Sequence, residues 1–94
     1  MADHVLTDES VPRVDMAART RKYRGKLYIA VEDRALELDE TAESIFRKID
    51  GRSTVRAIGE GLAAEYAIPV DDAVADAAEF IASLIDHGVV EAGS

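Results

Sequence analysis

Cysteine and tryptophan are absent from this chain of 94 residues, and aromatic side chains make up only 5% of it. The lack of cysteine excludes disulfides, thiolate nucleophiles, iron–sulfur ligation by thiolates and thiolate zinc sites. No segment approaches the roughly eighteen apolar residues that a membrane-spanning helix needs, and no secretory signal precedes the rest. We therefore expect a cytoplasmic protein without membrane contact, cofactor or bound metal.

Positive charge is also scarce, since 11 lysines and arginines stand against 19 aspartates and glutamates, for a net charge of −8. A chain of this charge repels phosphates, so nucleic acid is a disfavoured partner. The hydrophobic residues amount to 48% and are mostly alanine and aliphatic, which suits one small domain with a compact core. A large buried substrate pocket is not expected in such a core.

The N-terminal residues 1–16 are polar and acidic and show no sustained periodicity. Pro12 interrupts any helix in this segment, because proline lacks the backbone N–H that a helix interior uses. We therefore expect a flexible acidic arm over residues 1–16, followed by a single domain over residues 17–91.

Apolar and polar residues alternate in two consecutive segments, which is the pattern of half-buried strands. The apolar positions are Leu27, Ile29 and Val31 in the first segment and Leu36 and Leu38 in the second. Before them, Arg24-Gly25 favours a tight hairpin turn because glycine accepts positive φ. The sequence therefore predicts a three-stranded antiparallel sheet, with strands over Thr20–Tyr23, Lys26–Val31 and Ala35–Leu38.

The remaining chain has the periodicity of amphipathic helices. Asp39 and Ser53 are suitable N-caps, Pro69 interrupts the pattern, and Gly51 and Gly88 are typical of helix ends. These signals predict three helices, over Glu40–Asp50, over Thr54–Tyr66 and between Pro69 and Gly88. The fold class is therefore α+β, with the three-stranded sheet preceding the three helices.

Three motifs occur in order along this pattern: LELDETA at Leu36–Ala42, IDGRSTV at Ile49–Val55 and DHGVV at Asp86–Val90. Together they resemble the PqqD family, whose members are peptide-recognition elements in the biosynthesis of ribosomally made natural products. The resemblance implies a winged helix-turn-helix-like fold and the function of a peptide chaperone or adaptor. Such a protein binds the leader of a precursor peptide by strand addition and presents it to a modifying enzyme. The founding members serve a radical SAM enzyme in pyrroloquinoline quinone biosynthesis, and relatives serve mycofactocin or lasso-peptide assembly.

By this resemblance the peptide pairs with the third strand and lies against the third helix. The implied peptide-binding residues are Arg34, Ala35, Leu36, Glu37, Leu38, Ala73, Asp76, Phe80, Ser83 and Leu84. A helical wheel places Phe80 at the margin of the apolar face, beside Ala73 and Leu84. Phe80 is therefore either the floor of an apolar groove or part of the core, and the sequence leaves both interpretations open.

A basic cluster stands out in the otherwise acidic chain, formed by Arg19, Arg21, Lys22, Arg24 and Lys26. Its charge favours either docking of the partner enzyme, chiefly through Arg19, Arg21 and Lys22, or steering of an acidic leader peptide. The simpler interpretation is a solvated hairpin, because lysine and arginine commonly protect sheet edges. An open edge strand also allows pairing with a second copy, so a homodimer is a further candidate.

Candidate catalytic residues are few and poorly placed. His4 lies in the N-terminal arm, and His87 lies at a helix end, where a cation caps the dipole. The pair Asp71-Asp72 lies at a helix start, where carboxylates are expected for the same reason. Ser83 lies late in a helix, whereas the attachment serine of a carrier protein opens one. We therefore expect no enzymatic activity.

A winged-helix DNA-binding or transcriptional regulator domain is the main alternative, because strands and three helices also suit that fold. The third helix opposes it, since it carries no lysine or arginine and its carboxylates would meet the DNA phosphates. These carboxylates belong to Asp71, Asp72, Asp76, Glu79 and Asp86.

Overall fold

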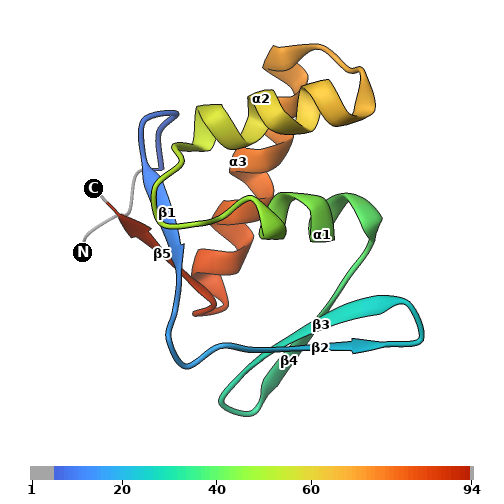
Figure 1. Cartoon of the computed structure of the whole chain (residues 1–94). Coiled ribbons are helices and arrows are strands. Elements are labelled where there is room, and N and C mark those ends of the chain that lie inside the picture. Colours follow the sequence, from blue (N-terminus) through green and yellow to red (C-terminus); the bar gives the residue numbers. More distant parts are fainter. Residues whose placement is uncertain (1–5, 94) are drawn as a thin grey trace.

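In the computed structural model of the chain, residues 6–93 are described, and they form five strands and three helices (Figure 1). The strands are β1 (Val11–Val14), β2 (Arg19–Tyr23), β3 (Lys26–Val31), β4 (Arg34–Leu38) and β5 (Val90–Gly93). The helices are α1 (Glu40–Arg47), α2 (Val55–Tyr66) and α3 (Val70–Asp86). This arrangement confirms the predicted α+β fold with a three-stranded antiparallel sheet followed by three helices. None of the described helices is both long and apolar enough to cross a membrane.

The three-stranded sheet has the order β2-β3-β4 and is antiparallel throughout. Arg24 and Gly25 both have positive φ, 54° and 81°, as a two-residue turn of the mirror-image type requires. Apolar residues then meet across the strands on the face toward the helices, with Leu27 opposite Leu38 and Ile29 opposite Leu36. Leu27, Ile29 and Leu38 are buried on this face and Leu36 is half-buried, as the alternation of apolar residues along the pleat predicts.

The segment before β2 belongs to the fold, and the prediction of a flexible arm is wrong for residues 6–16. β1 pairs antiparallel with β5 in a second, two-stranded sheet, and Pro12 is fully buried. A proline is tolerated there because such a strand has an edge on which no N–H is needed. Upstream of β1, the carbonyl oxygens of Ser10 and Asp8 accept hydrogen bonds from the N–H groups of Val55 and Arg56 at the start of α2. His4 and the rest of residues 1–5 lie outside the described residues.

The helix ends follow local capping chemistry. Asp39 caps α1 as predicted, since its Oδ1 accepts a hydrogen bond of 2.8 Å from the Ala42 N–H. α1 ends three residues before the predicted Asp50, and Thr54 rather than Ser53 caps α2. At the end of α3, His87 Nδ1 lies 2.8 Å from the Ser83 carbonyl oxygen, so the predicted capping role of His87 is confirmed.

The largest helix contact joins α2 and α3 and depends on Gly59. A Cβ built on Gly59 would lie 2.5 Å from Val74 Cα, so only a hydrogen fits between the two backbones. Ile58 and Leu62 of α2 and Ile81 and Leu84 of α3 belong to the same hydrophobic cluster, and all four side chains are buried. This pair of helices therefore forms the centre of the core.

Replacing Gly59 with alanine tests that close approach. Gly59→Ala forces α2 and α3 apart and should lower the free energy of unfolding by about 2–3 kcal/mol, measured by urea denaturation. Gly61→Ala is the matched control, because its Cβ meets only the flexible Lys48 side chain, at 3.0 Å. That control should be neutral or stabilising by up to about 1 kcal/mol, owing to helix propensity. Equal effects at both glycines would contradict the packing described.

The role of β1 is tested at Pro12. Pro12→Ser places a hydroxyl in a buried apolar position and should cost about 2 kcal/mol of unfolding free energy. Arg13→Ser, on the exposed face of the same strand, should change it by less than about 0.5 kcal/mol. If thermal denaturation finds both variants as stable as the parent chain, the segment is a loosely held arm after all.

Candidate functional site

β4 forms one edge of the three-stranded sheet and pairs only with β3 among the described residues. Val31 and Arg34 are paired across a two-residue turn. Residues beside such a turn form a hydrogen-bonded pair, and hydrogen-bonded and non-bonded pairs then alternate along the strands. The alternation directs the backbone N–H and C=O groups of Ala35 and Glu37 toward the open edge. A further strand can therefore pair with β4 through these two residues.

A groove of about 370 Å³ begins where β4 ends. Its lining residues are Asp39, Thr41, Ala42 and Ile45 at the start of α1, and Asp76, Glu79, Phe80 and Ser83 on α3. Three residues from the predicted set, Asp76, Phe80 and Ser83, therefore lie together. The side chain of Phe80 is half-buried, lines the groove and also packs against the core. Both interpretations of Phe80 thus hold in part.

The other predicted residues fall into two groups. Ala73 and Leu84 are fully buried on the core face of α3, so the prediction that their side chains contact a peptide is wrong. The helical wheel placed them beside Phe80, but the buried face of α3 is wide enough to include them. In β4, Arg34, Ala35 and Glu37 are exposed, Leu36 is half-buried and Leu38 is buried. Leu38 therefore offers a peptide neither its buried side chain nor its backbone N–H and C=O groups, which point toward β3 in the same alternation.

Five groove residues were absent from the predicted set: Asp39, Thr41, Ala42, Ile45 and Glu79. Four of them follow the edge strand directly in the sequence, within the LELDETA motif and the first turns of α1. Their position in the sequence could have indicated them. When a chain passes directly from an edge strand into a helix, the first residues of the helix lie beside that edge.

The electrostatics of the groove are one-sided. Asp39, Asp76 and Glu79 contribute carboxylates, whereas no lysine or arginine lines it. None of these three takes part in an ion pair within residues 6–93. Asp76 and Glu79 lie three residues apart on α3, a spacing at which like charges repel. The groove therefore combines an apolar floor of Phe80 and Ile45 with unpaired carboxylates at Asp76 and Glu79, while the Asp39 carboxylate at its edge caps α1.

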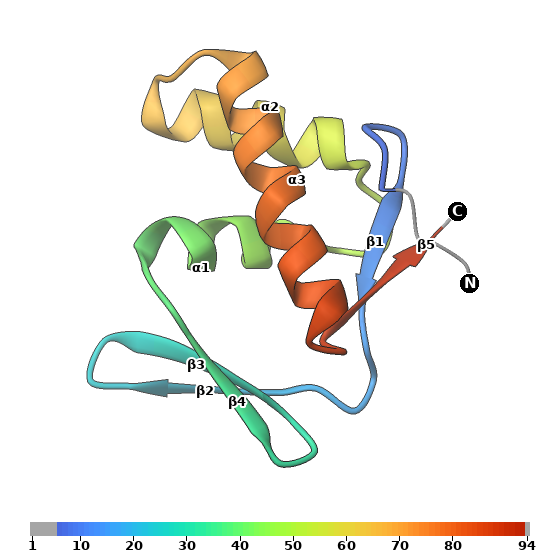
Figure 2. The same ribbon diagram turned by 180° about the vertical axis from the view of Figure 1, so that it is seen from behind.

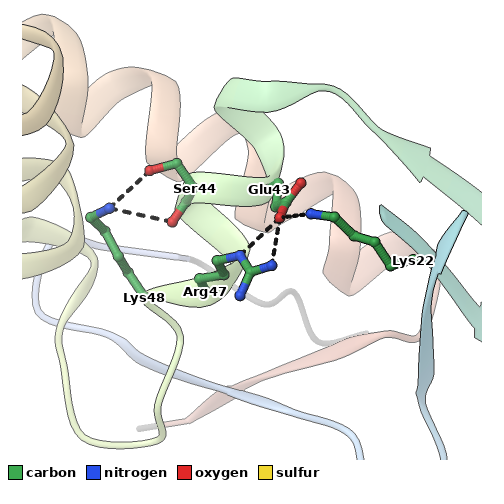
Figure 3. A network of polar contacts seen from close by, with 5 residues as sticks. All are labelled: Lys22, Glu43, Ser44, Arg47 and Lys48. Atoms are coloured by element: carbon green, nitrogen blue, oxygen red, sulfur yellow. Dashed lines mark hydrogen bonds and ion pairs between the residues drawn. The ribbon is translucent and has the colours of Figure 1, made fainter. Parts of the chain in front are cut away.

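Two polar networks hold α1 in place and so fix one wall of the groove. In the first, the Glu43 carboxylate of α1 binds Lys22 of β2 at 2.5 Å and Arg47 at 2.6 Å (Figure 3). In the second, Lys48, the C-cap residue that follows α1, binds the Glu65 carboxylate of α2 at 2.6 Å. Ser44, which is buried, donates to the same Glu65 oxygen and accepts from Lys48. α1 is thereby joined to the sheet on one side and to α2 on the other.

The predicted partner-docking residues separate across the sheet. Lys22 lies on the face toward α1, where Glu43 binds it, so a role for Lys22 in enzyme docking is not supported by its position. Arg19 and Arg21 project from the opposite face and are exposed. The basic cluster therefore does not line the groove beside β4.

Comparison with known proteins identifies the family of this chain. A family model described as coenzyme PQQ synthesis protein D, PqqD, matches residues 14–90. The chain belongs to the PqqD family. The motifs at the β4–α1 junction, between α1 and α2 and after α3 were thus correctly assigned, and all three lie within the matched range. No curated protein matches the chain.

A solved structure supports the same assignment for this PqqD-family chain. It is the solution structure of the PqqD truncation of PqqCD from Methylobacterium extorquens, described as a functional, stand-alone recognition element for ribosomally synthesized and post-translationally modified peptides. The two share 28% sequence identity with a TM-score of 0.80, over 93% of this chain and 95% of the other. The PqqD fold is therefore present over almost the whole chain.

The Lys22–Glu43–Arg47 network predicts a pH dependence of stability. Hydrogen bonds from Lys22, and next from Arg47, lower the pKa of Glu43 below its ordinary value of 4.5. A carboxyl whose folded pKa is depressed stabilises the fold above its unfolded pKa, and this contribution is lost as the pH falls through the folded pKa. Glu43→Gln should therefore destabilise the chain at neutral pH, and the difference from the parent should shrink below about pH 4.5.

Urea denaturation over a pH series measures this difference. Glu91→Gln serves as the control, because Glu91 is exposed and forms no ion pair among the described residues. A Glu43→Gln effect that is the same at neutral and acidic pH would show that the network does not depend on the charge of Glu43.

Proposed function

We propose that this PqqD-family chain is a peptide-binding adaptor without catalytic activity. It binds the leader segment of a ribosomally made precursor peptide as an added strand on β4 and presents the peptide to a modifying enzyme. The observation that carries the proposal is the open edge of β4 running directly into the groove between α1 and α3. The description of the Methylobacterium extorquens relative as a recognition element supports the same function.

In strand addition, the backbone and the side chains of the protein make different contributions to peptide binding. Pairing with Ala35 and Glu37 supplies hydrogen bonds that do not depend on the peptide sequence. Because side chains alternate along a strand, only every second peptide side chain faces the helices and the groove. An apolar peptide side chain there would cover the exposed part of Phe80 and the apolar surface of Ala42 and Ile45. Affinity thus comes from the backbone and selectivity from the groove.

The charge of the groove narrows the peptide class. A carboxylate rim without cations favours a peptide with lysine or arginine two residues from the apolar anchor, on the same face of the peptide strand. A cation at that place also relieves the repulsion between Asp76 and Glu79. We therefore propose a leader segment that is apolar and locally basic, in place of the acidic leader that the basic cluster suggested.

Membership of the PqqD family also supports a proposal for the modifying enzyme and the pathway. We place the modifying enzyme in the radical SAM class and the pathway in pyrroloquinoline quinone biosynthesis, with mycofactocin and lasso-peptide assembly as alternatives. A cytoplasmic location follows from that role. Sequence-specific DNA binding gains no support, because α3 presents exposed Asp72, Asp76 and Glu79 and carries no cation to meet phosphate.

Two labelled synthetic peptides test the proposed groove. Both are short and rich in valine and threonine. The central residues are Leu-Thr-Lys in one, the Leu-Lys peptide, and Leu-Thr-Glu in the other, the Leu-Glu peptide, so that the leucine and the charged residue lie on the same face of an added strand. The Leu-Lys peptide should bind more tightly, and Phe80→Ala should weaken its binding about tenfold, or about 1.4 kcal/mol. Fluorescence anisotropy measures both binding effects. The melting temperature should fall less in Phe80→Ala than in Leu38→Ala, because the Leu38 side chain is the more deeply buried.

Charge reversal provides the control for specificity. The double variant Asp76→Lys, Glu79→Lys should reverse the preference, so that the Leu-Glu peptide binds more tightly. Equal binding of the two peptides by the parent chain would exclude an acidic groove as the selective element. Binding of labelled duplex DNA in place of either peptide would overturn the adaptor function itself.

A further inference from the structure

The three-stranded sheet has a second face that no described element covers. Figures 1 and 2, from opposite sides, show the three helices on one side of β2, β3 and β4, with the other side open. This outer face carries a shallow hollow of about 630 Å³. Its lining residues are Arg19, Thr20, Arg21, Tyr23, Tyr28, Ala30 and Ala35.

The floor of the hollow is apolar and aromatic. Tyr28 and Ala30 of β3 lie at its centre and are half-buried, with Ala35 of β4 beside Ala30. Tyr23 at one end is 55% exposed and is one of the few large hydrophobic side chains that the fold leaves uncovered. The Arg24 guanidinium lies 5.4 Å from the Tyr23 ring centre, a cation–π contact that holds both side chains at the surface.

The rim of the hollow is positive. Arg19 and Arg21 of β2 line it, and Arg21 lies directly across from Tyr28 in the strand register. Among the strand residues of this face, Glu37 carries a carboxylate. Lys26 Nζ forms an ion pair with it at 3.1 Å. Neither arginine forms an ion pair with any residue between 6 and 93. Uncompensated positive charge is thus concentrated here, although the chain as a whole carries −8.

We propose that this outer face docks an acidic patch of a partner protein, one that presents carboxylates around an exposed apolar side chain. Arginine and tyrosine over a desolvated centre are the side chains that most often dominate protein interfaces. The charge complementarity selects an acidic partner and raises the rate of association. An extended polyanion such as nucleic acid is a poor fit, because beyond the hollow it would meet the acidic remainder of the chain.

The position of the hollow links docking to the peptide, and this step rests on the proposed function. Ala35 belongs both to the hollow and to the edge strand β4. A peptide strand added at β4 extends the sheet, so its alternate side chains continue the outer face next to Ala35 and Glu37. A protein docked on the outer face would then contact the peptide directly. The two sites lie on different faces and can be filled together.

The test uses the full-length chain, labelled with nitrogen-15, and an acidic probe peptide in which aspartates and glutamates surround Leu-Trp. Amide shifts should appear in Arg19–Tyr23 and Tyr28–Ala30, and the affinity should fall with rising salt. The double variant Arg19→Glu, Arg21→Glu should weaken binding at least about tenfold. The control Arg13→Glu, Arg52→Glu makes the same change of net charge at two exposed arginines away from the hollow and should leave binding unchanged.

Saturation with the Leu-Lys peptide completes the experiment. The acidic probe should still bind to the chain that carries the Leu-Lys peptide, whereas competition between the two would overturn the proposal of separate faces. Three other results would also overturn the proposal. They are an equal loss of probe affinity in both double variants, amide shifts confined to α3, and self-association through the outer face in place of probe binding. Failure of the Leu-Lys peptide alone refutes the peptide site and leaves the acidic docking face supported.

Discussion

The position of α1 over the three-stranded sheet is the constraint on which the groove depends. β4 runs through Asp39 straight into α1, so the edge strand and one wall of the groove are a continuous piece of chain. An ion pair between Glu43 and Lys22 joins this helix to β2, and an ion pair between Lys48, at the end of α1, and Glu65 joins it to α2. α3 supplies the other wall and is itself held against α2 by the contact at Gly59. A peptide strand at β4 therefore meets walls that are already in place, which lowers the entropic cost of binding.

Charge is divided between the two faces of the sheet. The groove on the helix side carries Asp39, Asp76 and Glu79, whereas the outer face carries Arg19 and Arg21. A net charge of −8 alone gives no sign of this division, because it averages over both faces. The division allows one small domain to attract a locally basic peptide on one side and an acidic protein surface on the other. An adaptor needs such a separation, since its two ligands must not compete for one site.

Local patterns in the sequence predicted what is local in the structure. The alternation in Lys26–Val31 and the turn at Arg24-Gly25 gave the β2–β3 hairpin, and Asp39 gave the start of α1, because short-range contacts decide these features. β1 was missed because its partner β5 lies at the opposite end of the chain and residues 1–16 show no sustained alternation of apolar and polar side chains. Ala73 and Leu84 were misplaced because a helical wheel does not show how wide the buried face is. The groove combines residues from α1 and α3, so no single segment could indicate it.

Amide hydrogen exchange of the chain with and without the bound Leu-Lys peptide tests the central claim, strand addition at β4, most directly. By the alternation of paired residues, Ala35 and Glu37 present their N–H groups at the β4 edge, and Thr20 and Lys22 present theirs at the β2 edge. Strand addition at β4 predicts slower exchange at Ala35 and Glu37 on peptide binding, with Thr20 and Lys22 unchanged. Protection at Thr20 and Lys22 instead, or at neither edge while the peptide is bound, would contradict the account.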